Sequence, residues 1–199
     1  QKIRKISYEE ILEMSSLGSK VLHPRSVELA MKYGIKVKVK NTFSKSLGTF
    51  LTNEDKTMER AIVSGISSSE DDSKITLIGI PDTPGIASKI FAPLTAENIN
   101  VDMIVQNITE DGKFTNLTFT VKKNEMQKSV DALKNSNLNF RDIHVEPNIC
   151  KLSIVGVGMK NNVGVAQKMF ETLAKKKINI MVISTSEIKI SVLIALNKK

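Results

Sequence analysis

The sequence predicts an α+β protein in which one strand–helix–strand–strand unit occurs twice. Two observations support this prediction: an internal repeat, and a change of hydrophobic period within each copy. Lys74–Gly79 matches Lys151–Gly156, 77 residues later, and Gly85–Ala87 matches Gly164–Ala166, 79 residues later. Chance does not readily supply glycines that match in one register, so we expect two copies of a single supersecondary unit.

The first copy alternates between the periods of strands and helices. Ile86, Ile90 and Leu94 recur every four residues, which predicts an amphipathic helix. Alternating apolar and polar residues around it predict strands, and Asp111-Gly112 predicts a turn between two of them. The expected strands are 74–79, 101–106, 117–121 and 143–145, with a second helix at 126–133. This βαββαβ order is the ferredoxin-like arrangement, an antiparallel sheet with two helices on one face.

The second copy repeats strand, helix, strand and strand, and the sequence ends before a second helix and a fourth strand appear. An additional strand is predicted at Ala61–Ile66, just before the first copy. We expect it to fill the missing position, which would interleave the two units. Residues 67–73 (Ser-Ser-Ser-Glu-Asp-Asp-Ser) are polar throughout and are expected to form a loop or linker.

The N-terminal block, residues 1–57, is predicted to hold two short helices and a strand. Ser7 precedes the first helix, and His23-Pro24 opens the second with proline at a favoured first helical position. Gly34 ends that helix, and a strand follows at Ile35–Val39. These elements are too few for an independent core, so we expect the block to be the end of a larger domain.

Composition excludes several classes of protein. The chain has 199 residues, 41% hydrophobic and 25% charged, which excludes a largely disordered chain. No apolar run approaches the roughly 20 residues of a membrane span, and no signal peptide is recognisable. The single Cys150 cannot form an internal disulfide and is expected to be a buried structural residue in a reducing compartment. The net charge of +8 is spread along the chain, and aromatic residues are only 5%, so the charge alone does not predict nucleic-acid binding.

No complete active site can be assigned. His23 and His144 are the only histidines, they lie far apart in the sequence, and neither belongs to a cluster with metal-ligand spacing. A glycine-rich phosphate loop of standard spacing is absent as well. We therefore assign no catalytic residue, no metal ligand and no cofactor to this chain.

The segment Asp82-Thr83-Pro84-Gly85 is the best candidate for a small-molecule site. We expect Thr83 to cap the following helix and Pro84 to be its first residue. The N–H groups and positive dipole of a helix start favour a carboxylate, whereas Asp82 suits an ammonium group. Together they suit a free amino acid. The same residues would also serve as a plain cap and turn, and the motif alone leaves both interpretations open.

Polar residues after each repeated helix add to this candidate. Asn100 and Asn179 occupy the same register in the two copies, at the start of the second strand. Gln106 lies on the same strand face as Asp102. Asparagines also commonly cap strands, and polar runs commonly form turns, so a structural role for these residues stays open.

These residues also resemble a known family. Asp82–Gly85 with Ile99–Gln106 resembles the ACT domain of aspartate kinases, and so does Ile178–Ile180 with Ile183–Ile194. Gly18–Arg25, and Asn41–Phe43 with Gly48-Thr49, resemble the end of the aspartate kinase catalytic domain. The resemblance implies four segments: the end of an α/β amino-acid-kinase domain (1–57), a strand and linker (58–73), a first ACT domain (74–147) and a second, short ACT domain (148–199).

The resemblance implies a regulatory function. Aspartate kinases use ATP and Mg²⁺ to phosphorylate the side-chain carboxylate of L-aspartate in the cytoplasm, the first step toward lysine, threonine and methionine. Their ACT pair binds lysine, and in some members threonine, for feedback inhibition. ACT units of two chains pair, which implies a homodimer, and the regulatory part works on a kinase catalytic domain or subunit. The family's phosphate-binding segment is absent here, so this chain alone is not expected to be a working kinase.

The resemblance also implies the effector-binding residues. Carried over position by position, they are Asp82, Gly85, Ile86, Ala87, Asn100, Gln106, Asn179, Ile180, Thr185 and Ser186. The second copy has Val163-Gly164 where many relatives have Pro-Gly, which leaves the competence of a second site open. Two alternatives to an amino-acid sensor remain: a ferredoxin-like nucleic-acid-binding module and a purely dimerising module.

Overall fold

The computed structural model describes residues 3–53, 62–110 and 112–198. The chain forms two compact units, one made of residues 1–69 with 152–192 and the other of residues 70–151 with 193–199. Ala61 of the predicted strand, residues 54–57 of the predicted N-terminal block and Asp111 of the predicted turn lie outside the described residues. Each unit is described by itself below.

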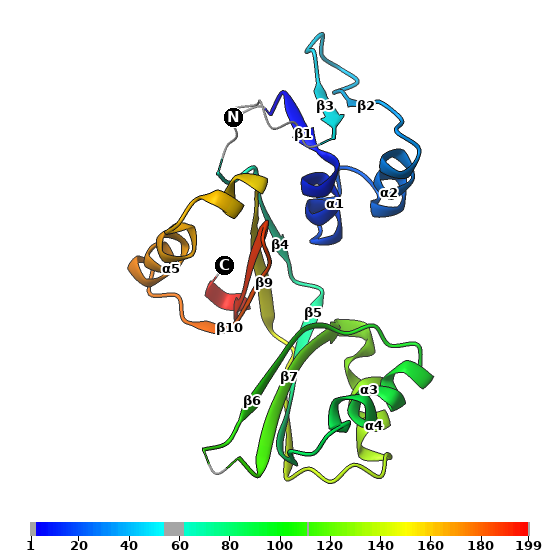
Figure 1. Ribbon diagram of the computed structural model, residues 1–199, viewed down its shortest axis with the longest axis vertical. Helices are drawn as coiled ribbons and strands as arrows, with labels where there is room; N and C mark the ends of the chain where they lie inside the picture. The colour runs from blue at the N-terminus through cyan, green and yellow to red at the C-terminus, as the bar shows by residue number, and fades with distance from the viewer. Residues whose placement is uncertain (1–2, 54–61, 111, 199) are drawn as a thin grey trace. The chain divides into compact units, whose positions relative to one another are not determined.

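The second unit contains the predicted βαββαβ fold. Its elements are β5 (Asp72–Pro81), α3 (Ile86–Ala96), β6 (Asp102–Ile108), β7 (Phe114–Lys122), α4 (Met126–Lys134) and β8 (Asp142–Glu146). The strand order is β6-β7-β5-β8, and every pairing is antiparallel. Figure 1 shows α3 and α4 on the same face of this sheet. The ferredoxin-like prediction is confirmed for this repeat.

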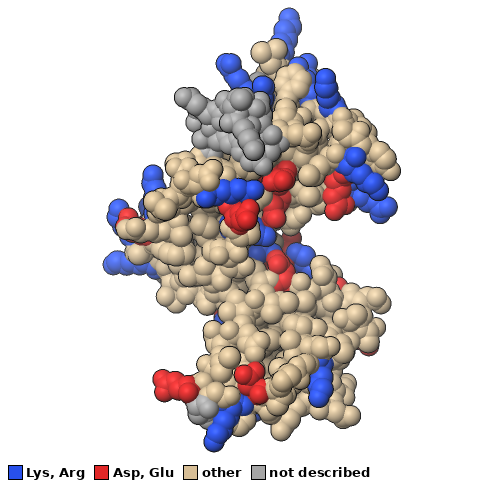
Figure 2. Space-filling model, viewed as in Figure 1, with Lys and Arg blue, Asp and Glu red and all other residues tan. Residues whose placement is uncertain are grey.

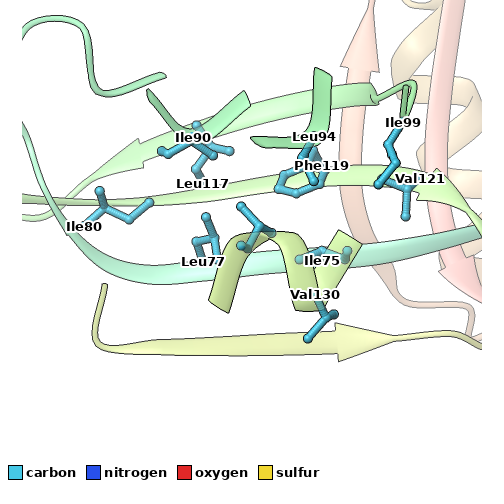
Figure 3. Close-up of a cluster of buried hydrophobic side chains, with 11 residues drawn as sticks. Ile75, Leu77, Ile80, Ile90, Leu94, Ile99, Leu117, Phe119, Val121 and Val130 are labelled. Carbon is cyan, nitrogen blue, oxygen red and sulfur yellow. The ribbon is translucent and has the colours of Figure 1, made fainter. Parts of the chain in front are cut away.

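One hydrophobic core joins this sheet to its two helices. The inward residues of β5 and β7 meet the apolar stripe of α3, so the alternation of the strands and the four-residue period of the helix serve the same interior. Ile90 and Leu94 of α3 have no exposed surface, and neither does Phe119 of β7. Figure 3 shows them gathered with the other side chains of the cluster. The rings of Phe91 and Phe119 meet edge to face, 5.5 Å apart.

The second sheet is completed by a strand from before the first repeat. Its elements are β4 (Gly65–Ser69), β9 (Ile149–Val155), α5 (Val165–Lys175), β10 (Ile180–Thr185) and β11 (Lys189–Ala195). The strand order is β10-β11-β9-β4. It matches the order β6-β7-β5-β8 of the first repeat, with β4 in the position that β8 has there. The two ferredoxin-like sheets are therefore interleaved in the sequence.

The polar segment 67–73 is not a loop, so that expectation was wrong. Its first three serines belong to β4, its last two residues begin β5, and only Glu70 and Asp71 lie between the strands. Likewise, the strand that fills the fourth position is Gly65–Ser69 and not 61–66. The reason is that β4 pairs with β9, and this pairing decides the conformation of the serines. A second contact holds the strand, because Ser67 is buried and its hydroxyl donates to the Leu17 carbonyl oxygen at 2.7 Å. Tertiary pairing overrides the weak strand propensity of serine.

The two repeats also agree in their backbone. Asn98 after α3 and Lys177 after α5, 79 residues apart, both adopt the left-handed conformation, with φ of 55° and 56°. This match extends the register of Gly85 and Gly164 to the other end of the helix. An offset of 79 thus describes the geometry of both helix–strand connections, as the sequence comparison predicted.

The N-terminal residues form a small three-stranded sheet with two helices. Its elements are β1 (Lys5–Ser7), α1 (Tyr8–Ser16), α2 (Pro24–Lys32), β2 (Val37–Val39) and β3 (Thr49–Thr52), with the order β1-β3-β2. Both predicted helix starts are confirmed: Ser7 caps α1, and His23 caps α2 with Pro24 next to it. Strands β1 and β3 were not predicted, because three or four residues are too few to display an alternating pattern.

Candidate functional site

The candidate loop connects β5 to α3 in the second unit. The Asp82 amide donates to the Lys113 carbonyl oxygen at 2.9 Å, and the Ile86 amide donates to the Thr83 carbonyl oxygen at 3.1 Å. The helix begins at Ile86 with Gly85 as its N-cap residue. The expectation that Thr83 is the cap and Pro84 the first helical residue was therefore wrong. The extra turn formed by Thr83 and the left-handed Gly85 delays the helix start by two residues.

The start of α3 is open to a ligand. Its N-cap residue is glycine and gives no side-chain capping bond, so the first turn relies on backbone bonds such as the one from the Ile86 amide to Thr83. Gly85 is exposed with φ of 84°, and nothing lies within 4 Å of the place where a Cβ atom would be. Glycine adopts this conformation without steric cost. Ile86 and Ala87, the next two predicted site residues, are half-buried.

Gln106 and Asp82 are brought together across 24 residues of sequence. The Gln106 Nε2 atom lies 3.5 Å from Asp82 Oδ1, at the long limit of a hydrogen bond. Gln106 comes from β6 and is exposed, whereas Asp82 is half-buried. The arrangement gathers a carboxylate, a side-chain amide and an uncapped helix start on one edge of the unit. Such a set can accept hydrogen bonds from an ammonium group and donate them to a carboxylate.

Asn100 does not join this group. It follows the C-terminal end of α3, whereas Gly85 precedes the N-terminal end. The 11 residues of the helix separate the two positions by about 16 Å at 1.5 Å per residue. Asn179, its counterpart after α5, is likewise exposed at the far end of its helix. The matching register of the two asparagines thus reflects the helix–strand connection.

The corresponding loop of the second repeat lies in the first unit. Gly164 has φ of 88° and precedes α5, which also starts without a side-chain cap. Asn161 stands 79 residues after Asp82, so this loop carries an amide where the first carries a carboxylate. The predicted residues Ile180, Thr185 and Ser186 belong to the same unit: Ile180 and Thr185 are the first and last residues of β10, and Ser186 opens the following hairpin. Ser186 donates its amide to the Lys189 carbonyl oxygen at 2.8 Å.

Metal and membrane features were searched over 3–53, 62–110 and 112–198. Within these ranges no three His, Cys, Asp or Glu side chains are grouped so that they could hold a metal ion. No helix in the described part of the chain has the length and apolar character to cross a membrane. His144 pairs instead with Asp142 at 2.9 Å on β8. Cys150 is buried in β9.

Comparisons with known proteins agree with this geometry. A sequence profile of the ACT domain matches residues 75–136 and 152–199. The regulatory subunit of aspartate kinase from Thermus thermophilus, in its ligand-free form, is 40% identical with a TM-score of 0.64, over 69% of this chain and 91% of that subunit. The chain belongs to the ACT-domain family of aspartokinases. The family assignment predicted from the sequence is confirmed.

Two longer aspartokinases match almost the entire chain. The aspartate kinase of Pseudomonas putida is 50% identical over 197 residues, which cover 98% of this chain and 48% of that protein. The structure of aspartate kinase from Synechocystis has a TM-score of 0.66 at 34% identity, over 99% of this chain and 36% of that one. The chain thus spans about half the length of the curated relative it matches.

A charge cluster that was not predicted from the sequence joins two buried side chains, Lys151 and Asp72, to two that are more than half exposed, Asp102 and Lys122. Lys151 belongs to β9, and its Nζ atom lies 3.0 Å from Asp72 Oδ2 and 3.0 Å from Asp102 Oδ2. Lys122 Nζ lies 2.8 Å from the other oxygen of Asp72. Burial alone would lower the pKa of Lys151, but the two carboxylates outweigh it and raise this pKa above its ordinary value. The signal in the sequence was the repeat itself, since Lys151 matches Lys74.

A second buried charge, Glu10, connects α1 to the second ACT repeat. Its Oε1 atom accepts hydrogen bonds from the Ser64 hydroxyl at 2.6 Å and from the Val157 amide at 3.0 Å, while Oε2 accepts from Ser7. Burial alone would raise the pKa of Glu10, but these hydrogen bonds outweigh it and hold this pKa below its ordinary value. Val157 opens the turn 157–161 that leads toward the loop of the second repeat. Ser7 was predicted to precede the helix, whereas the hydrogen bonds of Glu10 to Ser64 and Val157 were not predicted.

Proposed function

We propose that this chain is the regulatory part of a cytoplasmic aspartate kinase and that it binds free lysine, threonine or both as feedback effectors. The observation that carries the proposal is the meeting of Asp82 and Gln106 beside an uncapped helix start. Membership of the aspartokinase ACT family supports it, because feedback by end products is the function that the family resemblance implies.

The chemistry of the loop favours an amino-acid zwitterion. The Asp82 carboxylate accepts hydrogen bonds from the α-ammonium group, and the first N–H groups of α3 donate to the α-carboxylate. The Gln106 amide both donates and accepts, so it can contact either group. Exposed Gly85 lets the ligand approach the backbone closely. A ligand with a single charge would use only half of this arrangement.

Catalysis belongs to the rest of the enzyme in this proposal. The whole enzyme transfers the γ-phosphoryl group of ATP, with Mg²⁺, to the side-chain carboxylate of aspartate, which gives 4-phospho-L-aspartate. We assign residues 3–53 to the end of its catalytic domain. The small core of this block supports the assignment, because six buried side chains are too few for an independent domain. In this proposal the ACT repeats regulate catalysis by changing the position of the catalytic domain.

Dimerisation through ACT units fits the edges of the two sheets. β6 and β10 are edge strands, and both expose apolar side chains to solvent. Ile104 and Ile108 of β6 are 52% and 61% exposed, and Ile183 of β10 is 44% exposed. Unpaired edges with apolar residues favour pairing with another chain. An effector that bridges paired units would shift the population of their arrangements, and a coupling of about 1–3 kcal/mol suffices for feedback.

Nucleic-acid binding is the alternative that the charge of +8 favours. Figure 2 shows basic side chains on the visible face in separate groups, with acidic side chains between several of them. Phe119, in the middle of the central strand β7, faces the helices and has no exposed surface, and the other aromatic residue of this strand, Phe114, is 42% exposed at its first position. Ferredoxin-like modules that bind RNA present such aromatics to the bases instead. The sheet therefore favours the amino-acid effector.

Calorimetric titration tests the proposal directly. The chain is titrated with L-lysine, with L-threonine, and with each in the presence of the other, and saturable binding of at least one is expected. Gln106→Leu should weaken that binding about tenfold, while Gln127→Leu, an exposed glutamine of α4, should leave it unchanged. A dimer that binds neither amino acid would contradict the proposal and favour a purely dimerising module. Salt-dependent binding of RNA would favour the nucleic-acid alternative.

A further inference from the structure

The cluster around Lys151 pairs a buried lysine with carboxylates from two strands. Its side chain is only 6% exposed, and it lies between Asp72 of β5, which is buried, and Asp102 of β6, which is 57% exposed. All of these residues belong to the second compact unit. A lysine is rarely buried unless it is paired, so the cluster ties the starts of β5 and β6 to Lys151.

Asp102 uses its two carboxylate oxygens for different partners. Oδ2 binds Lys151, while Oδ1 accepts a hydrogen bond from the Met103 amide at 2.8 Å. Met103 adopts φ of 48°, a left-handed conformation that is common for glycine, occasional for asparagine and aspartate, and rare for other residues. The register of β6 against β7 shifts between Asp102 and Val105. Lys151 therefore orients the carboxylate that stabilises the strained residue of this β-bulge.

The bulge decides which way the rest of β6 faces. Beyond it the register is regular, and Gln106 is opposite Leu117, whereas Asp102 is opposite Thr120. Leu117 and Thr120 lie on opposite faces of β7, so the expectation that Gln106 shares a strand face with Asp102 was wrong, and the bulge is the reason. Because side chains alternate along a strand, a slip of one residue would turn Gln106 to the other face of the sheet. The contact between Gln106 and Asp82 depends on this register. The bulged residue Met103 lies three residues before Gln106, close enough to set its direction.

Lys74 provides a natural comparison within the same unit. It matches Lys151 in the repeat, it is also largely buried, and its side chain is 14% exposed. Lys74 pairs with Glu146 of the neighbouring strand β8 at 3.0 Å. That ion pair joins two strands on the side of β5 away from β7 and β6. Lys74 thus serves as the matched lysine, because its ion pair is with Glu146 and not with Asp102.

We propose that Lys151 is a positioning residue of the effector site: through Asp102 it holds the Met103 bulge, so that Gln106 faces the Asp82 loop. Lys151 touches no ligand. It acts through a strand of the first repeat while it belongs to β9, the first strand of the second repeat. This role rests on the proposed amino-acid site, and it adds a residue that neither the loop nor the repeat motifs identify.

The first experiment follows the unliganded protein. Two-dimensional ¹H–¹⁵N spectra are recorded for the wild type, Lys151→Met, Lys151→Arg and Lys74→Met. Lys151→Met should shift the Met103 backbone amide and the Gln106 side-chain amide, and Lys151→Arg should restore both in large part. Lys74→Met should leave both in place. Equal shifts in the two methionine variants, or none in either, would overturn the proposal.

The second experiment measures the affinity of each variant for whichever amino acid the wild type binds. Lys151→Met should weaken binding tenfold or more, and Lys74→Met should change it less than twofold. Moved resonances with unchanged affinity would overturn the positioning role. If the wild type binds no amino acid, the proposed function fails, while the spectra still decide whether Lys151 controls Gln106. If Lys151→Met does not fold, Asp102→Asn replaces it, because the amide oxygen still accepts from Met103 but loses the ion pair with Lys151.

Discussion

The loops before α3 and α5 share a backbone and differ in charge. Gly85 and Gly164 have φ of 84° and 88°, and neither helix has a side-chain cap. The first loop carries Asp82 with Gln106 beside it, whereas the second carries Asn161, with Thr185 in the register of Gln106. Duplication preserved the conformation that exposes the N–H groups of the helix. The carboxylate to which the proposed function assigns the ammonium group belongs to one copy, so the two loops share a backbone conformation and differ in the chemistry that the proposal requires.

The largest expected effect tests whether the two repeats are independent as structures. Phe119→Ala should destabilise the first repeat by about 3–5 kcal/mol, because the ring has no exposed surface and packs against Phe91. Hydrogen exchange should then increase across β5, β7 and α3, and α5 of the second repeat should keep its protection. Phe114→Ala, at a 42% exposed position of the same strand, is the control and should cost less than about 1 kcal/mol. Equal loss of protection in α5 would mean that the repeats unfold as one.

The charge difference between the loops predicts the next effect. Asp82→Asn gives the first loop the amide of the second, and it should weaken amino-acid binding at least tenfold. A hydrogen bond to a charged group contributes about 1.5–3 kcal/mol, which corresponds to this loss. Calorimetry measures the affinity, and Asp131→Asn on α4 is the control with the same change of charge. Unchanged affinity in Asp82→Asn would remove the carboxylate from the site and erase the distinction between the loops.

A third prediction compares the pH dependence of the two compact units. Glu10 in the first unit and Asp72 in the second both have a pKa below the ordinary values of 4.5 and 3.8. Burial opposes both shifts, and hydrogen bonds and lysine charges outweigh it. A depressed folded-state pKa stabilises the protein above the unfolded pKa, and this contribution is lost as the pH falls through the folded-state value. Stability should therefore be constant near neutrality and decline below about pH 4.5.

Glu10→Gln isolates the contribution of the first unit. It should lower stability at pH 7 by about 1.5–3 kcal/mol, because a neutral amide replaces a carboxylate that accepts several hydrogen bonds. The loss should shrink as the pH falls. Urea unfolding at several pH values between 7 and 3 measures both effects. Glu9→Gln, one residue earlier on the same helix, is the control, and a pH profile that Glu10→Gln leaves unchanged would contradict the assignment.

Features with many residues were predicted from the sequence, and features made by distant contacts were not. The βαββαβ order followed from two hydrophobic periods repeated at a fixed offset, as in Ile86–Leu94. The serines of β4 and β5 show no such period, because their conformation comes from pairing with distant strands. Asp82 and Gln106 were both predicted as site residues, because each belongs to a short local pattern: a loop motif for Asp82 and an alternating strand for Gln106. Lys151 was missed because its role depends on two carboxylates 49 and 79 residues away.

The smallest expected effect is also the most direct test of the shared scaffold. Gly85→Ala and Gly164→Ala should each cost about 1–2 kcal/mol of stability, because a Cβ atom is strained at positive φ even where, as here, nothing lies within 4 Å of it. The two costs should agree to within about 0.5 kcal/mol, because both glycines have nearly the same φ and open surroundings, and distant positions do not influence each other. Amino-acid affinity should separate them: Gly85→Ala should weaken binding at the Asp82 loop, and Gly164→Ala should weaken it less. Equal stability costs with unequal affinities are what a duplicated backbone with diverged side chains requires, whereas unequal stability costs would mean that the two loops no longer share one conformation.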